Sequence, residues 1–225
     1  RMPELPEVET VRRGLAPVME GGTILSLLQN RPNLRFPFPE RFVERVSGAR
    51  IERLGRRAKF LTADLSTGEV LVMHLGMTGR FTVGVGATAD FHHATGSDAR
   101  HDHVVFHMQD GHTVTYNDPR RFGFMELWPA ATFDAYPRLA AMGPEPLSNG
   151  FSAAYLDTAL KGKATPIKSA LLDQSIIAGL GNIYVCEALY RAGISPKRKA
   201  SSIPGQRAAR LAPAINQVIA EAIDA

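Results

Sequence analysis

The sequence predicts an α+β fold in which a strand-rich part is followed by a helical part, and three observations support this prediction. An apolar stripe through Leu5, Val8 and Leu15 has helical spacing and follows acidic residues that favour a helix start. Between residues 23 and 128, short apolar or alternating runs are separated by turn residues, as in antiparallel hairpins. Beyond residue 150, apolar positions recur at helical spacing.

Length and composition limit the domain organisation and the class of protein. The 225 residues can form two modest domains, and the Pro- and Gly-containing segment 136–150 predicts a linker between residues 1–135 and 151–225. No apolar run approaches a membrane span and no segment resembles a signal peptide, so we expect a cytoplasmic protein. The single cysteine, Cys186, excludes an intramolecular disulfide, and the net charge of +4 permits a polyanionic partner without requiring one.

The first motif, PELPEVET at residues 3–10, places Pro3, Glu4 and Glu7 at the start of the expected N-terminal helix. Proline suits a first helical position, and carboxylates near a helix N-terminus are favoured by the helix dipole. Spacing alone therefore predicts no more than an ordinary amphipathic helix, with Gly14 or Gly21 at its end.

The strand-rich part contains two turns with unusual residues. Residues 55–59 form a basic run that ends at Lys59. Composition alone predicts that this run is a solvated loop. Met77 lies in the turn 74–80, which contains two glycines. The sequence alone identifies it only as an apolar turn residue. Segment 84–97 is small and polar, which predicts a mobile loop.

Three histidines, His101, His103 and His107, alternate along an expected strand and so share one face of it. No fourth ligand follows at a spacing typical of zinc, so we expect no metal site there. The next motif, at residues 117–123, puts Arg120, Arg121 and Phe122 on an Asp-Pro turn. Two guanidinium groups and an aromatic ring have the chemistry to hold a phosphate and wedge a base step, although composition alone favours an ordinary turn.

The third motif lies at residues 174–184, where glycines including Gly181 precede the expected N-cap Asn182. A helix N-terminus of this kind is a ready anion site, and Lys168 lies on the preceding expected helix. A nucleotide P-loop is not indicated because no Gly-Lys-Ser/Thr follows.

Taken together, PELPEVET, DPRRFG and GLGNIY occur in an order that resembles the formamidopyrimidine-DNA glycosylase family, bacterial-type base-excision repair enzymes. The resemblance implies an N-terminal helix on a two-layer antiparallel β-sandwich, followed by an all-α helix-two-turn-helix domain. It also implies removal of oxidised purines (8-oxoguanine and formamidopyrimidines), followed by cleavage of the strand as an AP lyase. The implied partner is double-stranded DNA with damaged bases or abasic sites, bound by a monomer in the nucleoid.

The resemblance implies catalytic roles for Pro3, Glu4 and Lys59. The imino nitrogen of an N-terminal proline attacks the sugar to form a Schiff base, the glutamate transfers protons during ring opening, and β,δ-elimination follows. Glu7 is a further active-site candidate. Arg1 and Met2 precede Pro3 here, and an acylated Pro3 nitrogen has no nucleophilic lone pair, so we expect a chain that retains both residues to be inactive.

The resemblance also implies DNA-binding roles for residues of all three motifs and the segments between them. In the family, a methionine fills the gap left by the flipped nucleotide, an arginine enters the duplex opposite the lesion, and a phenylalanine stacks beside it. The corresponding residues here are Met77, Arg120 and Phe122. The implied contacts to the DNA backbone come from His101, His103, Arg121, Lys168, Gly181 and Asn182.

Family members usually continue into a four-cysteine zinc finger, so one zinc ion is expected in a full-length member and none in these residues. Three alternative functions stay open. An endonuclease VIII-type enzyme for oxidised pyrimidines shares the architecture, although Leu5 and DPRRFG favour the purine branch. A non-catalytic DNA-binding or lesion-recognising protein is the second alternative. A structural RNA-binding relative of the helix-two-turn-helix element is the third, and it would leave the N-terminal motif unexplained.

Overall fold

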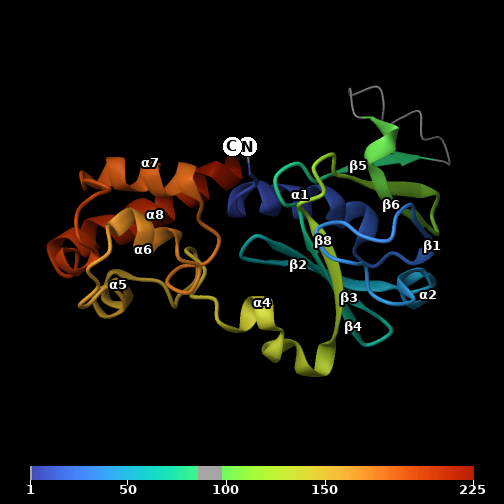
Figure 1. The fold of residues 1–225 in the computed structure, drawn as a ribbon, viewed down its shortest axis with the longest axis horizontal. Helices are drawn as coiled ribbons and strands as arrows, with labels where there is room; N and C mark the ends of the chain where they lie inside the picture. The colour runs from blue at the N-terminus through green and yellow to red at the C-terminus, as the bar shows by residue number, and fades with distance from the viewer. Residues whose placement is uncertain (1, 86–97) are drawn as a thin grey trace. The chain divides into compact units, whose positions relative to one another are not determined.

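The computed structural model describes residues 2–85 and 98–225, which form two compact units (Figure 1). The first unit contains the described residues up to Pro3 and Val8–Tyr136, and the second contains Glu4–Glu7 and Pro137–Ala225. The N-terminal helix α1 (Leu5–Met19) therefore starts in the second unit and continues in the first. Pro6, rather than Pro3, lies in its first turn, and Gly21, with φ of 77°, follows its end.

The first unit contains two antiparallel sheets of four strands each within its described residues. One sheet has the order β1-β6-β7-β5 and the other β2-β3-β4-β8. Their strands are β1 (Ile24–Gln29), β2 (Ile51–Arg57), β3 (Phe60–Leu65), β4 (Glu69–His74), β5 (Arg80–Val85), β6 (Asp102–Met108), β7 (His112–Asn117) and β8 (Phe124–Pro129). The short helices of this unit are α2 (Phe42–Val46), η1 (Ala99–His101) and η2 (Ala130–Ala135).

The core of the first unit lies between the two sheets. Phe106 and Val114 from one sheet and Leu61 and Leu71 from the other are all buried in one apolar cluster. Because side chains alternate along a strand, each sheet presents one apolar face to the other. The predicted β-sandwich with an N-terminal helix is confirmed.

The second unit is helical in its described residues. Its helices are α4 (Pro137–Ala140), α5 (Ala153–Ala159), α6 (Ile167–Leu172), α7 (Asn182–Ala192), η3 (Ala200–Ser202) and α8 (Gln206–Asp224). Helices α7 and α8 pack against each other, and Leu5 from the start of α1 is buried in the same apolar cluster. The predicted α+β class, with an all-α second part, is confirmed.

One local expectation differs from the structure. The basic run at 55–59 is not a solvated loop, because β2 extends through Arg57 and Ala58 makes a tight turn with φ of 54°. Segment 136–150 contains α4, and its Gly143 N–H donates to Gln174 O at 2.8 Å. The mobile loop expected at 84–97 falls mostly outside the described residues; Gly84 and Val85 belong to β5.

No helix among the described residues is long and apolar enough to cross a membrane. The domain boundaries expected near residues 135 and 150 stay a prediction for limited proteolysis.

Candidate active site and DNA-binding loops

The buried carboxylate of Glu4 binds the N-terminus of α7. Oε1 accepts a hydrogen bond from Gly181 N at 2.6 Å and Oε2 accepts one from Ile183 N at 3.1 Å. The side chain is 3% exposed, so the carboxylate is almost fully removed from water. The first N–H groups of a helix have no partner within it, and their dipoles favour an anion. Glu4 therefore occupies part of the anion site that the sequence predicts at this helix.

Two glycines allow the N-terminal segment to approach α7 this closely. A Cβ atom on Gly181 would lie 2.6 Å from Glu4 Cδ, and one on Gly179 would lie 2.5 Å from Leu5 Cδ1. The backbone is joined there as well, because Leu5 N donates to Gly179 O at 3.0 Å. Gln174 stabilises the glycine turn by accepting from Gly179 N at 2.9 Å. The glycines of GLGNIY thus make room for Glu4.

Pro3 and Glu7 lie on either side of Glu4 in the chain. Pro3 is partly exposed and directly precedes the buried Glu4, so the imino nitrogen of a chain that starts at Pro3 is one residue away from a fixed carboxylate. Glu7 accepts a hydrogen bond from the hydroxyl group of Tyr184 on α7 at 3.2 Å. The motif therefore places two carboxylates against one helix.

Asn182 is not the N-cap of α7, because Gly181 takes that position and Asn182 is the first helical residue. Glu4 lies outside the helix and supplies the hydrogen-bond acceptor that an N-cap side chain would otherwise provide. Asn182 is exposed, and Lys168 on α6 is partly exposed. Both side chains are therefore accessible to a ligand.

Lys59 lies in the turn between β2 and β3, which is held by an ion cluster around the buried Glu9. Arg56 donates to Glu9 Oε1 at 3.1 Å and to Ala58 O at 3.0 Å, while Arg12 and Arg13 donate to the same carboxylate. Burial raises the pKa of Glu9, but the hydrogen bonds from the three arginines outweigh it and lower the pKa to about 2. The basic run is thus partly neutralised by Glu9, and this cluster positions the turn that contains Lys59.

The carboxylate of Asp118 joins two loops of the first unit. Oδ1 accepts from Thr78 Oγ1 at 2.6 Å and from Arg121 N at 3.1 Å; Oδ2 accepts from Tyr116 OH at 2.9 Å and from Gly123 N at 3.0 Å. Asp118 is fully buried. Burial, together with the neighbouring Asp118 charge, raises the pKa of Tyr116, so its hydroxyl stays a donor. The four donors fix the turn that carries Met77 relative to the loop 119–123.

Three glycines allow these two loops to pack closely against each other and against Tyr116. A Cβ atom on Gly76 would lie 2.4 Å from Gly123 N, and one on Gly123 would lie 2.0 Å from the Tyr116 hydroxyl group. A Cβ atom on Gly79 would lie 2.4 Å from the same hydroxyl group. The two loops therefore form one rigid platform, defined here as residues 75–79 and 118–123, from which Met77 projects partly exposed.

The exposed tip of this platform carries a cation and an aromatic ring in contact. The Arg120 guanidinium lies 4.8 Å from the centroid of the Phe122 ring, and Phe122 is 42% exposed. Arg121 between them has φ of 56°, a left-handed conformation that turns the chain sharply. Phe122 thus presents an exposed aromatic ring on a loop that the buried Asp118 carboxylate holds in place. These are the properties of a side chain that wedges between stacked bases.

The histidines do not form the single row that the sequence predicts. His101 belongs to η1, and a register shift between Asp102 and Val104 separates it from the regular part of β6. His103 is buried and donates from Nε2 to Asp118 O at 2.8 Å, and burial lowers its pKa. His103 therefore supports the Asp118 loop from inside, while His101 stays partly exposed.

Each unit thus brings together a subset of the predicted residues. The second unit contains Glu4, Glu7, Lys168, Gly181 and Asn182. The first contains Pro3, Lys59, Met77, His101, His103, Arg120, Arg121 and Phe122. Sequence reasoning missed Asp118, Thr78 and Glu9 as organising residues. An acid directly before Pro119 in a run with two arginines is a weak signal for Asp118, and Thr78 had no signal.

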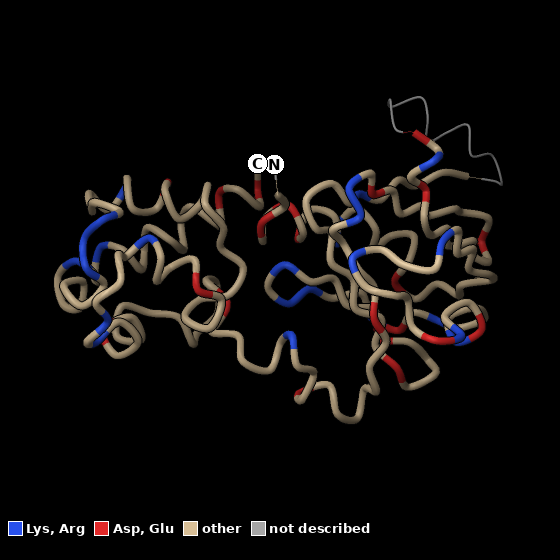
Figure 2. Tube along the Cα trace, in the orientation of Figure 1, with Lys and Arg blue, Asp and Glu red and all other residues tan. Residues whose placement is uncertain are grey.

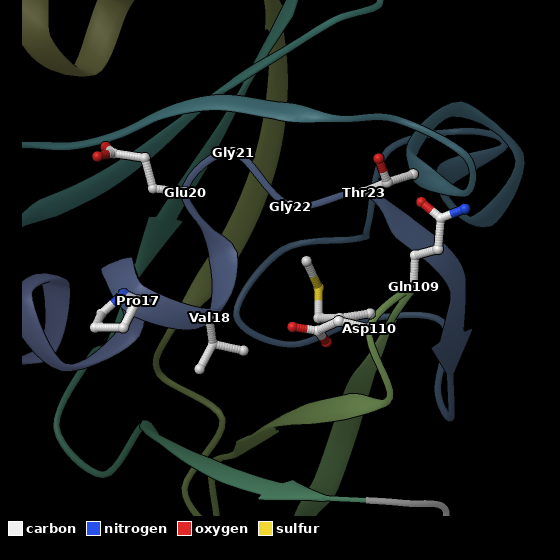
Figure 3. Close-up of a pocket in the computed structure, with 9 residues that line it drawn as sticks. Pro17, Val18, Glu20, Gly21, Gly22, Thr23, Gln109 and Asp110 are labelled. Carbon is white, nitrogen blue, oxygen red and sulfur yellow. The ribbon is translucent and has the colours of Figure 1, made fainter.

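The described residues contain no metal-binding group, and the cavity in Figure 3 is lined by none of the predicted site residues. Among residues 2–85 and 98–225, no group of three or more His, Cys, Asp or Glu side chains is arranged to hold a metal ion. These 225 residues contain one cysteine, so they do not themselves supply four thiolate ligands. A cavity of about 430 Å³ lies between the end of α1 and the β6–β7 turn, lined by residues such as Glu20 and Asp110 and by none of the predicted site residues (Figure 3).

Comparisons with known proteins agree with this division of the chain. Residues 2–125 match the family model of the formamidopyrimidine-DNA glycosylase N-terminal domain, and residues 142–225 match that of the formamidopyrimidine-DNA glycosylase H2TH domain. A formamidopyrimidine-DNA glycosylase from Ruegeria pomeroyi is 59% identical over 224 residues, which cover 100% of this chain and 79% of the relative. A relative of the same name from Methylocella silvestris is 56% identical over 233 residues, covering 100% of this chain and 80% of the relative.

Solved structures show the same similarity. The MutM (Fpg) protein of Thermus thermophilus has a TM-score of 0.82 and 39% identity, covering 99% of this chain and 76% of that one. The Lactococcus lactis enzyme non-covalently bound to DNA with an AP site has a TM-score of 0.87 and 31% identity, covering 99% of this chain and 82% of that one.

Proposed function

Because the chain belongs to the formamidopyrimidine-DNA glycosylase family, we propose that it removes oxidised purines from duplex DNA and then cuts the strand at the abasic sugar. The glycosylase and AP lyase activities follow from family membership. The observation that best supports a catalytic assignment in this chain is the buried Glu4 carboxylate, held by Gly181 and Ile183 N–H directly after Pro3.

The reacting form in this proposal begins at Pro3. Its secondary amine attacks C1′ of the damaged nucleotide, the bond from C1′ to the base breaks, and the base leaves with a proton. The Glu4 carboxylate takes the N–H proton that the attacking amine loses and passes it to O4′, and the sugar ring opens to give an iminium. The iminium acidifies the C2′ proton, and its removal expels the 3′ phosphate; a second elimination expels the 5′ phosphate. Lys59 contributes a positive charge near these phosphates, and Glu7 supports the N-terminal segment through Tyr184.

DNA binding in this proposal uses residues from both units. Met77, Arg120 and Phe122 on the rigid platform fill the space of the flipped nucleotide and contact the opposite strand. Arg121, His101, Lys168 and Asn182 contact phosphates, and Gly181 and His103 position these contacts from buried sites. A monomer suffices for this, and the monomeric state stays a prediction for sedimentation analysis. Abasic-site DNA is the partner seen with the Lactococcus lactis relative.

The test is cleavage of a duplex with one 8-oxoguanine by the chain that begins at Pro3. We expect strand cleavage by this form and a loss of about 10²- to 10⁴-fold in Glu4→Gln, the range that a lost general acid causes. Glu187→Gln is the matched control, because Glu187 is an exposed carboxylate on α7 that pairs with Arg191.

Three outcomes separate the alternatives. Tight binding of the lesion duplex without any cleavage would support a non-catalytic DNA-binding protein. Faster cleavage at an oxidised pyrimidine than at 8-oxoguanine would support an endonuclease VIII-type enzyme. Full activity of Glu4→Gln would remove Glu4 from the mechanism.

A further inference from the structure

Two segments of the second unit that are far apart in sequence are joined by backbone hydrogen bonds. Ile167 N donates to Arg198 O at 2.7 Å, and Lys168 N donates to Pro196 O at 3.2 Å. Ala200 N donates to Thr165 O and Ser201 N to Lys163 O, both at 2.8 Å. The loop after α7 is therefore fixed beside the start of α6 instead of being a free surface loop.

This arrangement concentrates positive charge. Lys197, Arg198 and Lys199 are consecutive and exposed, and Lys168 lies on the hydrogen-bonded neighbouring segment. We call these four residues the basic surface. The sequence contains no Asp or Glu at residues 158–172 or 188–220, so neither segment supplies a counter-charge. Figure 2 shows a continuous blue stretch in the loop after α7.

Among the described residues, the three consecutive cations have no ion pair with an acidic side chain, unlike several arginines of this protein. In the part of the chain that the structure describes, no ion pair involves Lys197, Arg198 or Lys199, whereas Arg191 on α7 pairs with both Glu187 and Glu221. A hollow of about 450 Å³ beside them is lined by Ser195, Lys197, Arg198, Lys199 and Ser202. Cations held close together repel one another, so an anionic ligand relieves a cost that the free protein carries.

We propose that the basic surface binds the phosphate backbone of duplex DNA that flanks the lesion, beyond the nucleotides of the lesion site. The proposal rests on the proposed function, because Lys168 is one of its DNA contacts and the surface extends directly from it. Helix α7 has 11 residues and separates Asn182 from the start of the loop that carries Lys197, Arg198 and Lys199. At about 1.5 Å per residue the helix is about 16 Å long, the length of about five base pairs, so these three cations extend the surface from Lys168 along the duplex arm. The duplex arm, rather than the flipped nucleotide, is the ligand.

The probe is a duplex with a tetrahydrofuran abasic analogue, which binds without being cleaved. Affinity is measured by fluorescence anisotropy between 50 and 200 mM salt, for duplexes with about five or about fifteen base pairs on each side of the analogue. The triple variant Lys197→Ala, Arg198→Ala, Lys199→Ala is compared with Arg41→Ala, Arg50→Ala, Arg53→Ala. The second variant removes the same charge from exposed positions of the β-sandwich unit.

On the long duplex, the first variant is expected to reduce the slope of log K against log salt by about 2 to 3, since each lost phosphate contact contributes about 0.9. Between 50 and 200 mM salt, the affinity of the variant for the long duplex therefore falls by a factor about 40 times smaller than the factor for the unchanged protein. On the short duplex both proteins are expected to agree within about twofold. The control variant is expected to keep the original slope.

An unchanged slope on the long duplex, or an equal loss on both duplexes, would overturn the proposal. Displacement of the long duplex by an RNA duplex but not by undamaged DNA would assign the surface to RNA and also overturn it. Because no step of this measurement needs cleavage, a chain that fails to excise 8-oxoguanine can still show the expected slopes. A chain that excises 8-oxoguanine can fail to show them.

Discussion

Thr78 donates its hydroxyl hydrogen to Asp118 Oδ1 at 2.6 Å and accepts a hydrogen bond from Arg120 N at 3.0 Å. This pair links the turn that carries Met77 to the loop that carries Arg120 and Phe122. Both loops contribute exposed residues to the proposed lesion contacts, whereas Asp118 is fully buried. The geometry of the two exposed loops thus depends on a buried carboxylate.

Asp118→Asn should test this dependence. An amide nitrogen cannot accept the hydrogen bonds that one carboxylate oxygen now receives, so two buried donors lose their partner. We expect unfolding free energy to fall by about 2 to 3 kcal/mol and the abasic-analogue duplex to bind more weakly. Urea denaturation and anisotropy measure the two effects. Asp110→Asn, at an exposed hairpin turn, is the matched control and should stay within about 0.5 kcal/mol. Equal stability of the two variants would contradict the account.

Gly181→Ala should separate catalysis from stability. The added Cβ atom would meet the end of the Glu4 side chain at 2.6 Å, and a side chain can move aside more easily than a backbone. We therefore expect Glu4 to shift and cleavage of the lesion strand to slow by at least about tenfold, with a small change in melting temperature.

Gly193→Ala is the opposite control for that experiment. Gly193 has φ of 68° at the end of α7 and nothing lies within 4 Å of its added Cβ atom. We expect it to cost about 1 kcal/mol of stability through strain and to leave cleavage unchanged. If Gly181→Ala lost stability and kept full activity, Glu4 would not need its present position.

Glu9 should make the stability of the protein depend on acidic pH. Its pKa is lowered from 4.5 to about 2 in the folded state, so its contribution is present above pH 4.5 and is lost as pH falls toward 2. Glu9→Gln should therefore be less stable by about 2 to 3 kcal/mol at pH 7, and the difference should shrink at about pH 3. Urea denaturation at both pH values measures this. Glu44→Gln, which breaks an exposed ion pair with Arg41, should change stability by less than about 0.5 kcal/mol at either pH. A pH-independent difference at Glu9 would refute the argument.

Local patterns predicted much of this fold because they reflect burial within single elements. The stripe through Leu5, Val8 and Leu15 marks a buried face, and all three side chains are buried in the structure. The N-cap of α7 could not be predicted in the same way. Its partner, Glu4, lies 177 residues from Gly181 in sequence, and no local propensity reports a contact of that range.

The candidate site shows the same limit. Arg120 and Phe122 stood out because exposed arginines and rings are chemically distinctive. Asp118 and Thr78 act through hydrogen bonds between loops that are 40 residues apart, and an ordinary Asp-Pro turn has the same local sequence. His103 looked like a surface phosphate ligand, but the register shift in β6 places it inside against Asp118. Packing between loops decided these positions.

The central claim is that Pro3 is the nucleophile, and borohydride trapping on a lesion duplex tests it most directly. The chain that begins at Pro3 should form a covalent protein–DNA adduct, and mass spectrometry should locate it on Pro3, because borohydride reduces the iminium to a stable amine. The matched chain that retains Arg1 and Met2 should form none, since its Pro3 nitrogen is an amide. Absence of an adduct with the first chain, or equal trapping of both, would contradict the mechanism.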